Sequence, residues 1–199
     1  MSTRVDVWSD FACPFCFLAT CSLEKLQQEY ELAIHWRSFE LRPAGSPPIT
    51  PHKLAQIDVM RPRFEQMAWE QYGVNVHSGP FGIDTRLALI ADKYAESRGK
   101  GEAFHQAVMC AYWQEARSID RPDVLQTIAV SVGLNAEQFG TALRDAQFDA
   151  EVSADVQLAQ EYGLSGVPAL VFANTYLISG AQPYDVLKRV MEKVQGEKV

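Results

Sequence analysis

The fold is decided by the stretch RVDVWSDFACPFC at residues 4–16. Its first five residues alternate polar and β-forming side chains, which predicts a short strand over residues 4–8. Residues 9–12 form the turn that follows, and Pro14 stands where the first residue of a helix tolerates proline. Over residues 15–29 the apolar side chains recur at helical spacing. The two cysteines of the stretch therefore fall in the first turn of a helix that follows a strand.

The spacing of Cys13 and Cys16 suits dithiol–disulfide exchange. Cys13 lies at the helix N-terminus, where free backbone N–H groups and the helix dipole favour a thiolate, so we expect its pKa to fall below the free value of about 8.5. Cys16 faces the same side of the turn and can attack a mixed disulfide on Cys13. Pro14 stiffens the turn. Phe15, between the two cysteines, is expected to be exposed as an apolar contact surface for a partner.

Other roles for Cys13 and Cys16 have less support in the sequence. Chance burial is disfavoured by the spacing, the proline and the strand-to-helix context. A zinc site needs two further ligands, whereas no second cysteine pair exists and the histidines are scattered, so we expect no metal. Cys21 and Cys110 are expected to pack in the core, with a redox role for either left open. Three methionines at helical positions are also expected to fill the core. They are Met60, Met67 and Met109.

For two ionisable residues, Asp10 and His105, the sequence allows more than one role. Asp10 stands three residues before Cys13. Its carboxylate either relays a proton to the resolving thiol, or opposes thiolate formation, or holds the turn as a cap. His105 could face the cysteines from a helix that begins near Glu102, although a solvated or hydrogen-bonded histidine is the more frequent case.

Charge and hydropathy narrow the class of partner. The chain has 199 residues, 47% of them hydrophobic, and a formal net charge of −7. This length and composition allow a sizeable core, while the acidic balance disfavours nucleic acid as a partner. No apolar run of about 18 residues could span a bilayer, and no apolar signal core follows Met1. We therefore expect a cytoplasmic protein that meets thiols or disulfides and neither nucleic acid nor membranes.

Beyond the opening stretch, strand character occurs only near the two ends. A strand is predicted over residues 32–39, followed by a proline- and glycine-rich loop at 43–51. The middle of the chain is helical, with expected helices at 52–72 (interrupted at Pro62), 84–97, 102–117, 122–132 and 136–146. The end is expected to hold a helix at 150–162, a hairpin of strands at 168–172 and 176–179, and a last helix at 183–194.

This order, β-α-β, helical block, α-β-β-α, predicts an α/β thioredoxin fold with a large all-helical domain inserted in its middle. We expect the thioredoxin-like parts at residues 1–42 and 149–199 and the helical insertion at residues 43–148.

Three stretches resemble the DsbA-like thioredoxin family, and most of all its FrnE branch, which is related to 2-hydroxychromene-2-carboxylate isomerases. They are DFACPFC at 10–16, GVP at 166–168 and ISGAQP at 178–183. The resemblance spans nearly the whole chain. It implies that Cys13 is the attacking, solvent-facing sulfur and Cys16 the buried resolving one. It also implies a cis Pro168 beside them, with Gly166 and Val167 at the substrate site and the Val167 backbone hydrogen-bonding an extended substrate.

A departure from that family's pattern at Phe15 bears on the redox chemistry. Phe15 stands where the family usually carries Trp or His, and a phenyl ring offers a thiolate neither a hydrogen bond nor a positive charge. We therefore predict a less depressed Cys13 pKa, and a more reducing couple, than in strongly oxidising periplasmic relatives.

The sequence thus predicts a protein or small-molecule disulfide reductase, isomerase or oxidase that works through a mixed disulfide. No tightly bound cofactor is expected, with glutathione as a candidate co-substrate. One alternative is a glutathione-dependent isomerase or transferase, although such enzymes usually carry serine where Cys13 stands. A second is a non-catalytic peptide-binding or chaperone module with an apolar cleft. Both monomer and homodimer are compatible with the sequence.

Overall fold

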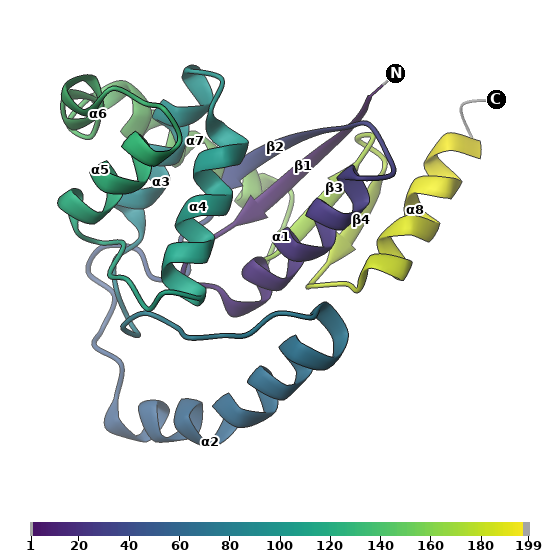
Figure 1. Ribbon diagram of the computed structural model, residues 1–199, viewed down its shortest axis with the longest axis horizontal. Coiled ribbons are helices and arrows are strands. Elements are labelled where there is room, and N and C mark those ends of the chain that lie inside the picture. The colour runs from purple at the N-terminus through teal and green to yellow at the C-terminus, as the bar shows by residue number, and fades with distance from the viewer. Residues whose placement is uncertain (1, 197–199) are drawn as a thin grey trace.

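A four-stranded mixed sheet forms the centre of the molecule in the computed structural model, which describes residues 2–196 (Figure 1). The strands are β1 (Thr3–Ser9), β2 (Leu32–Ser38), β3 (Ala169–Phe172) and β4 (Tyr176–Ser179), in the spatial order β2-β1-β3-β4. β1 pairs parallel with β2 and antiparallel with β3, and β3 and β4 form an antiparallel hairpin. The thioredoxin-type α/β fold predicted from the element order is confirmed.

Helices cover both faces of this sheet. α1 (Pro14–Gln27) connects β1 to β2 and shares one apolar cluster with α8 (Tyr184–Gly196). That cluster includes Val5 and Val7 of β1, which lie on the same face because successive side chains of a strand point to opposite sides. On the other face, Trp8 packs with residues of the helix α7 (Ala146–Glu161). The end of β1, and the cysteines that follow it, are therefore held between two packed layers.

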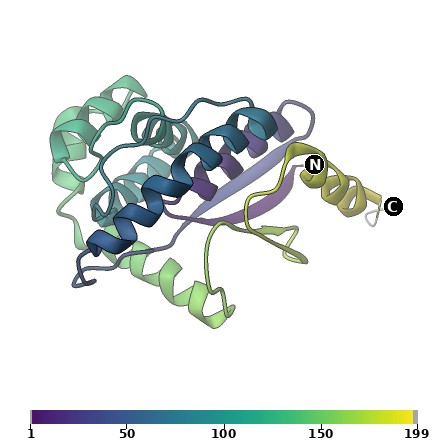
Figure 2. The ribbon, with the colours of Figure 1, turned by 90° about the horizontal axis from the view of Figure 1, so that it is seen from below.

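The middle of the chain is helical, as predicted. Its other elements are α2 (Pro51–Met67), the π-helical turn η1 (Ala68–Tyr72), α3 (Arg86–Ser97), α4 (Gly101–Trp113), α5 (Pro122–Ser131) and α6 (Ala136–Ala142). Figure 1 shows α3 to α7 gathered beside the sheet, and Figure 2 shows α2 lying across the molecule as a separate rod. Aromatic rings fill the insertion's own core, including Tyr94, Phe104 and Phe139.

The structure corrects the predicted helix at 52–72. Pro62 does not interrupt it, because it lies inside the continuous helix α2. No residue of α2 is buried, so water can reach the backbone carbonyl that loses its partner at the proline. The helix instead changes its hydrogen bonding at Ala68, where a π-helical turn carries the chain to Gly73.

Two further boundaries differ from the prediction. α4 ends at Trp113 instead of continuing to 117, because the carbonyls of Tyr112 and Trp113 accept hydrogen bonds from the loop residues Gly79 and His77, both at 2.7 Å. The helices expected at 136–146 and 150–162 also have different bounds in the structure. α6 stops at Ala142 and α7 already begins at Ala146, since the Asp145 side chain caps its first turn.

The expected border between the insertion and the second thioredoxin-like part, at 148/149, falls inside α7, and the three-part division stays a prediction. In residues 2–196, no helix combines the length and the apolar character needed to cross a bilayer.

Candidate active site

The site begins with the cap of α1. Cys13 has an extended backbone and caps the helix, and its Sγ accepts a hydrogen bond from the backbone N–H of Cys16 at 3.3 Å. The Cys13 N–H donates in turn to the Asp10 carbonyl at 3.0 Å. Pro14 occupies the first helical position, where its missing N–H costs nothing. The turn that carries the motif is therefore fixed by the backbone itself.

The pKa of the Cys13 thiol is lowered, as the sequence predicts. The largest cause is the hydrogen bond from the Cys16 thiol, and burial opposes it. The backbone amides of Cys16 and Phe15 lower the pKa further, whereas the Asp10 carboxylate raises it. The first turn of the helix thus stabilises a Cys13 thiolate, which is the reactive form in disulfide exchange.

Cys16 has the opposite electrostatic setting. Its side chain is buried, and burial raises its pKa well above the ordinary range, with the neighbouring Cys13 thiol adding to the effect. The Asp10 backbone amide and the Ser9 hydroxyl oppose this shift. The two sulfurs therefore differ in the way that an attacking and a resolving thiol must differ.

A loop distant in the sequence completes the site. The Val167–Pro168 peptide bond is cis, which confirms the expectation drawn from the resemblance. The Cys13 thiol donates to the Val167 carbonyl at 3.5 Å, so the loop that contains Gly166 lies directly against the Cys13 sulfur. The expectation of a solvent-facing Cys13 is wrong, because the residue is only 3% exposed beneath this loop.

Phe15 is exposed as predicted, with 46% of its surface accessible. Its ring meets Phe64 of α2 edge-on, with 5.9 Å between the ring centroids. Beside the pair lies a groove of about 540 Å³ between the start of α1 and the α2–η1 segment. Sequence reasoning missed the α2 side of this groove. Met60, expected in the core, lines the groove instead and is 67% exposed.

Asp10 has the geometry of a cap. Its buried carboxylate accepts hydrogen bonds from the backbone N–H groups of Ala12 at 2.8 Å and Leu41 at 2.7 Å. Burial raises the pKa of Asp10, against the lowering effect of these two amides and of the Thr85 hydroxyl. Leu41 and Thr85 are distant in the sequence, and no local signal pointed to them. The carboxylate thus ties the motif's turn to the segment that leaves β2.

His105 does not point at the cysteines. Its ring stacks on the Trp36 ring, with 3.7 Å between the ring centroids, and its centroid lies 4.7 Å from that of the Phe11 ring. Its Nδ1 is 2.9 Å from an Asp92 carboxylate oxygen. This is the hydrogen-bonded, buried histidine that the sequence analysis gave as the more frequent case. Phe11 is fixed on a second side, since its carbonyl accepts from the Trp113 indole at 2.8 Å. His105 therefore supports the motif's turn from behind.

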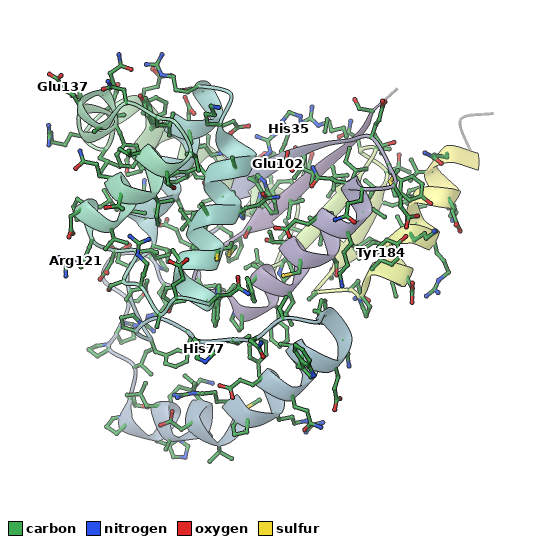
Figure 3. The ribbon with its side chains drawn as sticks, in the orientation of Figure 1. His35, His77, Glu102, Arg121, Glu137 and Tyr184 are labelled. Atoms are coloured by element: carbon green, nitrogen blue, oxygen red, sulfur yellow. The ribbon has the colours of Figure 1, made fainter. Side chains whose placement is uncertain are left out.

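The remaining cysteines lie outside the motif. Cys21 and Cys110 are both partly buried, and burial raises the pKa of Cys21 to about 12, which leaves it a poor nucleophile at neutral pH. Within residues 2–196, no three His, Cys, Asp or Glu side chains gather as a metal site would require. Figure 3 shows two of the histidines far apart, His35 on β2 and His77 on the loop after η1.

Comparison with known proteins also indicates a DsbA-like thioredoxin domain. The family model described as "DSBA-like thioredoxin domain" matches residues 4–192. The uncharacterized protein YwbO of Bacillus subtilis is 29% identical, with complete coverage of both chains. A probable DsbA oxidoreductase from Streptomyces coelicolor has a TM-score of 0.84 and 28% identity, over 99% of this chain and 92% of that one.

Two more distant structures share the fold. A 2-hydroxychromene-2-carboxylate isomerase aligns with a TM-score of 0.83 and 22% identity, over 98% of this chain and 97% of its own. The cytosolic disulfide reductase DsbM from Pseudomonas aeruginosa, in a structure with glutathione, aligns with a TM-score of 0.68 and 19% identity, over 96% and 99%. The family model spans far more than half of the sequence, so this chain belongs to the DSBA-like thioredoxin domain family.

Proposed function

We propose that this protein is a dithiol–disulfide oxidoreductase in which Cys13 attacks and Cys16 resolves. The observation that carries the proposal is the place of the Cys13 sulfur at the N-terminus of α1, where the Cys16 N–H donates to it at 3.3 Å, with the buried Cys16 one turn along. The loop of Gly166, Val167 and Pro168 beside Cys13 supports it, because a strand-like backbone there can receive a substrate segment. Membership of the family supports the same chemistry.

The reaction follows from this asymmetry. The Cys13 thiolate attacks one sulfur of a substrate disulfide, the substrate S–S bond breaks, and the first substrate thiolate leaves. Cys16 then loses its proton and attacks the Cys13 sulfur. A Cys13–Cys16 disulfide forms, and the second substrate thiolate is released. Two electrons pass from the enzyme dithiol to the substrate, and the reverse sequence oxidises a dithiol substrate.

Asp10 has a proposed place in the second step. Its carboxylate has a raised pKa and contacts the turn that carries both sulfurs, so it is the candidate acceptor for the Cys16 proton. Slower release of a trapped mixed disulfide in Asp10→Asn, with no slowing of its formation, would support this relay. Equal slowing of both steps would leave Asp10 with its capping role alone.

The cellular setting is part of the proposal. The chain would act in the cytoplasm on thiols and disulfides, with neither nucleic acid nor membrane as partner and as a monomer or homodimer. Glutathione is the proposed co-substrate that reduces the Cys13–Cys16 disulfide, since two glutathione thiols supply the two electrons. The name of DsbM, a cytosolic reductase whose structure contains glutathione, supports this setting. The FrnE branch within the family stays a prediction.

The central experiment is insulin reduction and refolding of a scrambled disulfide protein by the purified chain. Wild type should catalyse both, Cys13→Ser should abolish both, and Cys16→Ser should accumulate a mixed disulfide on Cys13 because the resolving step is lost. Cys110→Ser is the matched control and should behave as wild type. Equal activity of Cys13→Ser and wild type would refute the proposal.

The isomerase alternative is favoured only by the likeness to 2-hydroxychromene-2-carboxylate isomerase. It requires glutathione as an activated thiol cofactor, so calorimetry with a Cys13→Ser, Cys16→Ser protein decides it. Stoichiometric glutathione binding to that protein would favour isomerase or transferase chemistry. The binding-module alternative rests on the groove beside Phe15, and it predicts that the same double variant still suppresses aggregation of an unfolded protein.

A further inference from the structure

We propose that the groove beside Phe15 selects low-molecular-weight disulfides that carry an aromatic or other apolar group and a carboxylate close to the sulfur. The inference rests on the proposed oxidoreductase function and specifies its substrate class. It comes from three features, which are the apolar walls of the groove, the unpaired Arg63 in its lining and its position beside the covered Cys13.

The walls are apolar on both sides. From the motif side the groove is lined by Pro14, Phe15 and Trp113, and Phe81 belongs to the loop after η1. Its volume of about 540 Å³ lies within the range of about 300–1,000 Å³ that small-molecule pockets occupy. Such pockets are mostly apolar with a few placed polar groups, which is the composition seen here.

The opposite wall is a stripe on α2. The stripe residues lie three or four positions apart, so they share one helix face. They are Ile57, Met60, Phe64 and Met67. This face is turned toward the motif, yet none of these residues is buried. Exposed apolar surface beside the Cys13–Cys16 motif indicates a site that is covered when a ligand is present.

Two arginines line the groove of this acidic chain. Arg61 and Arg63 line it together with a single acid, Glu70. Arg61 is engaged, since it pairs with Asp58 and lies 5.5 Å from the centre of the Phe81 ring. In residues 2–196 no side chain forms an ion pair with Arg63. Its guanidinium is therefore free to meet a carboxylate on the ligand.

The access to Cys13 favours a small occupant. Cys13 is 3% exposed, with the Val167 carbonyl 3.5 Å from its sulfur. The loop that contains Val167 must move before any disulfide reaches this sulfur, and a small disulfide needs the smaller opening. Cys13 does not itself line the groove, but its neighbours Pro14 and Phe15 do, so a ligand held there lies beside the motif. A slender disulfide in the groove would place its apolar group against the α2 stripe, its carboxylate at Arg63 and its sulfur at Phe15, next to Cys13.

The test measures single-turnover reduction of four disulfides by the pre-reduced protein. Dithiobis(nitrobenzoate) has an aromatic ring and a carboxylate, and dithiodipyridine has only the ring. Oxidised glutathione has carboxylates without an aromatic ring, and cystamine has neither. The rate constant of each variant is divided by that of wild type for the same probe, which cancels the different intrinsic reactivities of the four disulfides.

Arg63→Gln should slow dithiobis(nitrobenzoate) about two- to fivefold, the effect of one exposed charge pair, and leave dithiodipyridine unchanged. Phe81→Ala should slow both aromatic probes and leave cystamine unchanged. The matched controls are Arg144→Gln, an exposed arginine at the end of α6, and Leu177→Ala, an exposed apolar residue of β4. Both controls should match wild type with every probe.

Three results would overturn the inference. One is an Arg63→Gln ratio equal to that of Arg144→Gln for dithiobis(nitrobenzoate). Another is a Phe81→Ala loss that is the same for cystamine as for the aromatic probes. The last is a scrambled protein substrate that Phe81→Ala slows selectively, which would assign the groove to polypeptide. If wild type reduces none of the four probes and no protein disulfide, the proposed function itself fails.

Discussion

At the scale of single residues, the proposed activity depends on the difference between two sulfurs one helical turn apart. Cys13 receives hydrogen bonds at the open end of α1, while Cys16 is buried beneath it. The motif and its position at a helix start could be read from the sequence, because proline and the two cysteines act locally. The partners of Asp10 could not, since Leu41 and Thr85 reach it only in the folded chain.

Neutralising Asp10 should make Cys13 more acidic. The Asp10 carboxylate raises the Cys13 pKa through charge repulsion, so Asp10→Asn should shift the midpoint of Cys13 alkylation against pH to a lower pH. Iodoacetamide labelling of Cys13, followed by mass spectrometry across pH, measures that midpoint. Asp123→Asn removes an exposed carboxylate on α5 and should leave it unchanged. A midpoint that rises in Asp10→Asn would contradict this electrostatic account.

The side chain at position 15 should set the redox potential. A histidine between the cysteines can carry positive charge toward the thiolate, so Phe15→His should lower the Cys13 pKa and raise the reduction potential of the pair. Equilibration with glutathione buffers measures the potential, and Phe15→Leu is the matched apolar control that should stay near wild type. Equal potentials for the His and Leu variants would show that residue 15 does not tune the couple.

At the scale of elements, α2 differs from the other α-helices in that none of its residues is buried. Its existence was predictable from helical spacing, whereas its continuity through Pro62 was not. A proline predicts a break when the lost hydrogen bond is buried, and here water can compensate. The ends of α4, α6 and α7 were also mispredicted, since they are set by loop hydrogen bonds and by the Asp145 cap.

The backbone of α2 should exchange its amide hydrogens faster than that of α1, because a helix without buried residues opens at low cost. Pro62→Ala should slow exchange in α2, with a local gain of up to about 3 kcal/mol from the restored helical hydrogen bond and geometry. Hydrogen–deuterium exchange with peptide resolution measures both helices. Protection of α2 equal to that of α1 in the wild-type protein would disagree with its separate packing.

At the scale of the whole molecule, buried charges connect α3 and α7 of the helical layer to the sheet. The Asp155 carboxylate of α7 pairs with Arg37 of β2 at 3.0 Å and with Lys93 of α3 at 2.5 Å. It also accepts the Ser38 N–H at 3.0 Å. The sequence predicted the order of strands and helices, because hydrophobic periodicity fixes each element. This network was invisible to it, since its members are distant along the chain.

Removing Asp155 should destabilise the protein. Asp155→Ala removes the shared partner of Arg37, Lys93 and the Ser38 N–H, while Arg37 keeps Asp6 and Lys93 keeps Glu96 and the Trp36 carbonyl, so we expect a cost of about 1–3 kcal/mol. Urea denaturation followed by circular dichroism gives the free energy of unfolding. Asp123→Ala breaks an exposed pair with Arg121 and should cost at most about 1 kcal/mol. Similar losses for the two variants would mean that the network does not hold the layers together.

The most direct measurement of the central claim is a redox titration of the wild-type protein in glutathione buffers, with acid quenching and peptide mapping by mass spectrometry. We predict a single two-electron transition in which Cys13 becomes bonded to Cys16, with Cys21 and Cys110 still reduced and a potential clearly below about −120 mV, the value of a strongly oxidising relative. Failure of Cys13 and Cys16 to form a disulfide at any glutathione ratio would contradict the account. A potential near −120 mV would contradict the role assigned to Phe15.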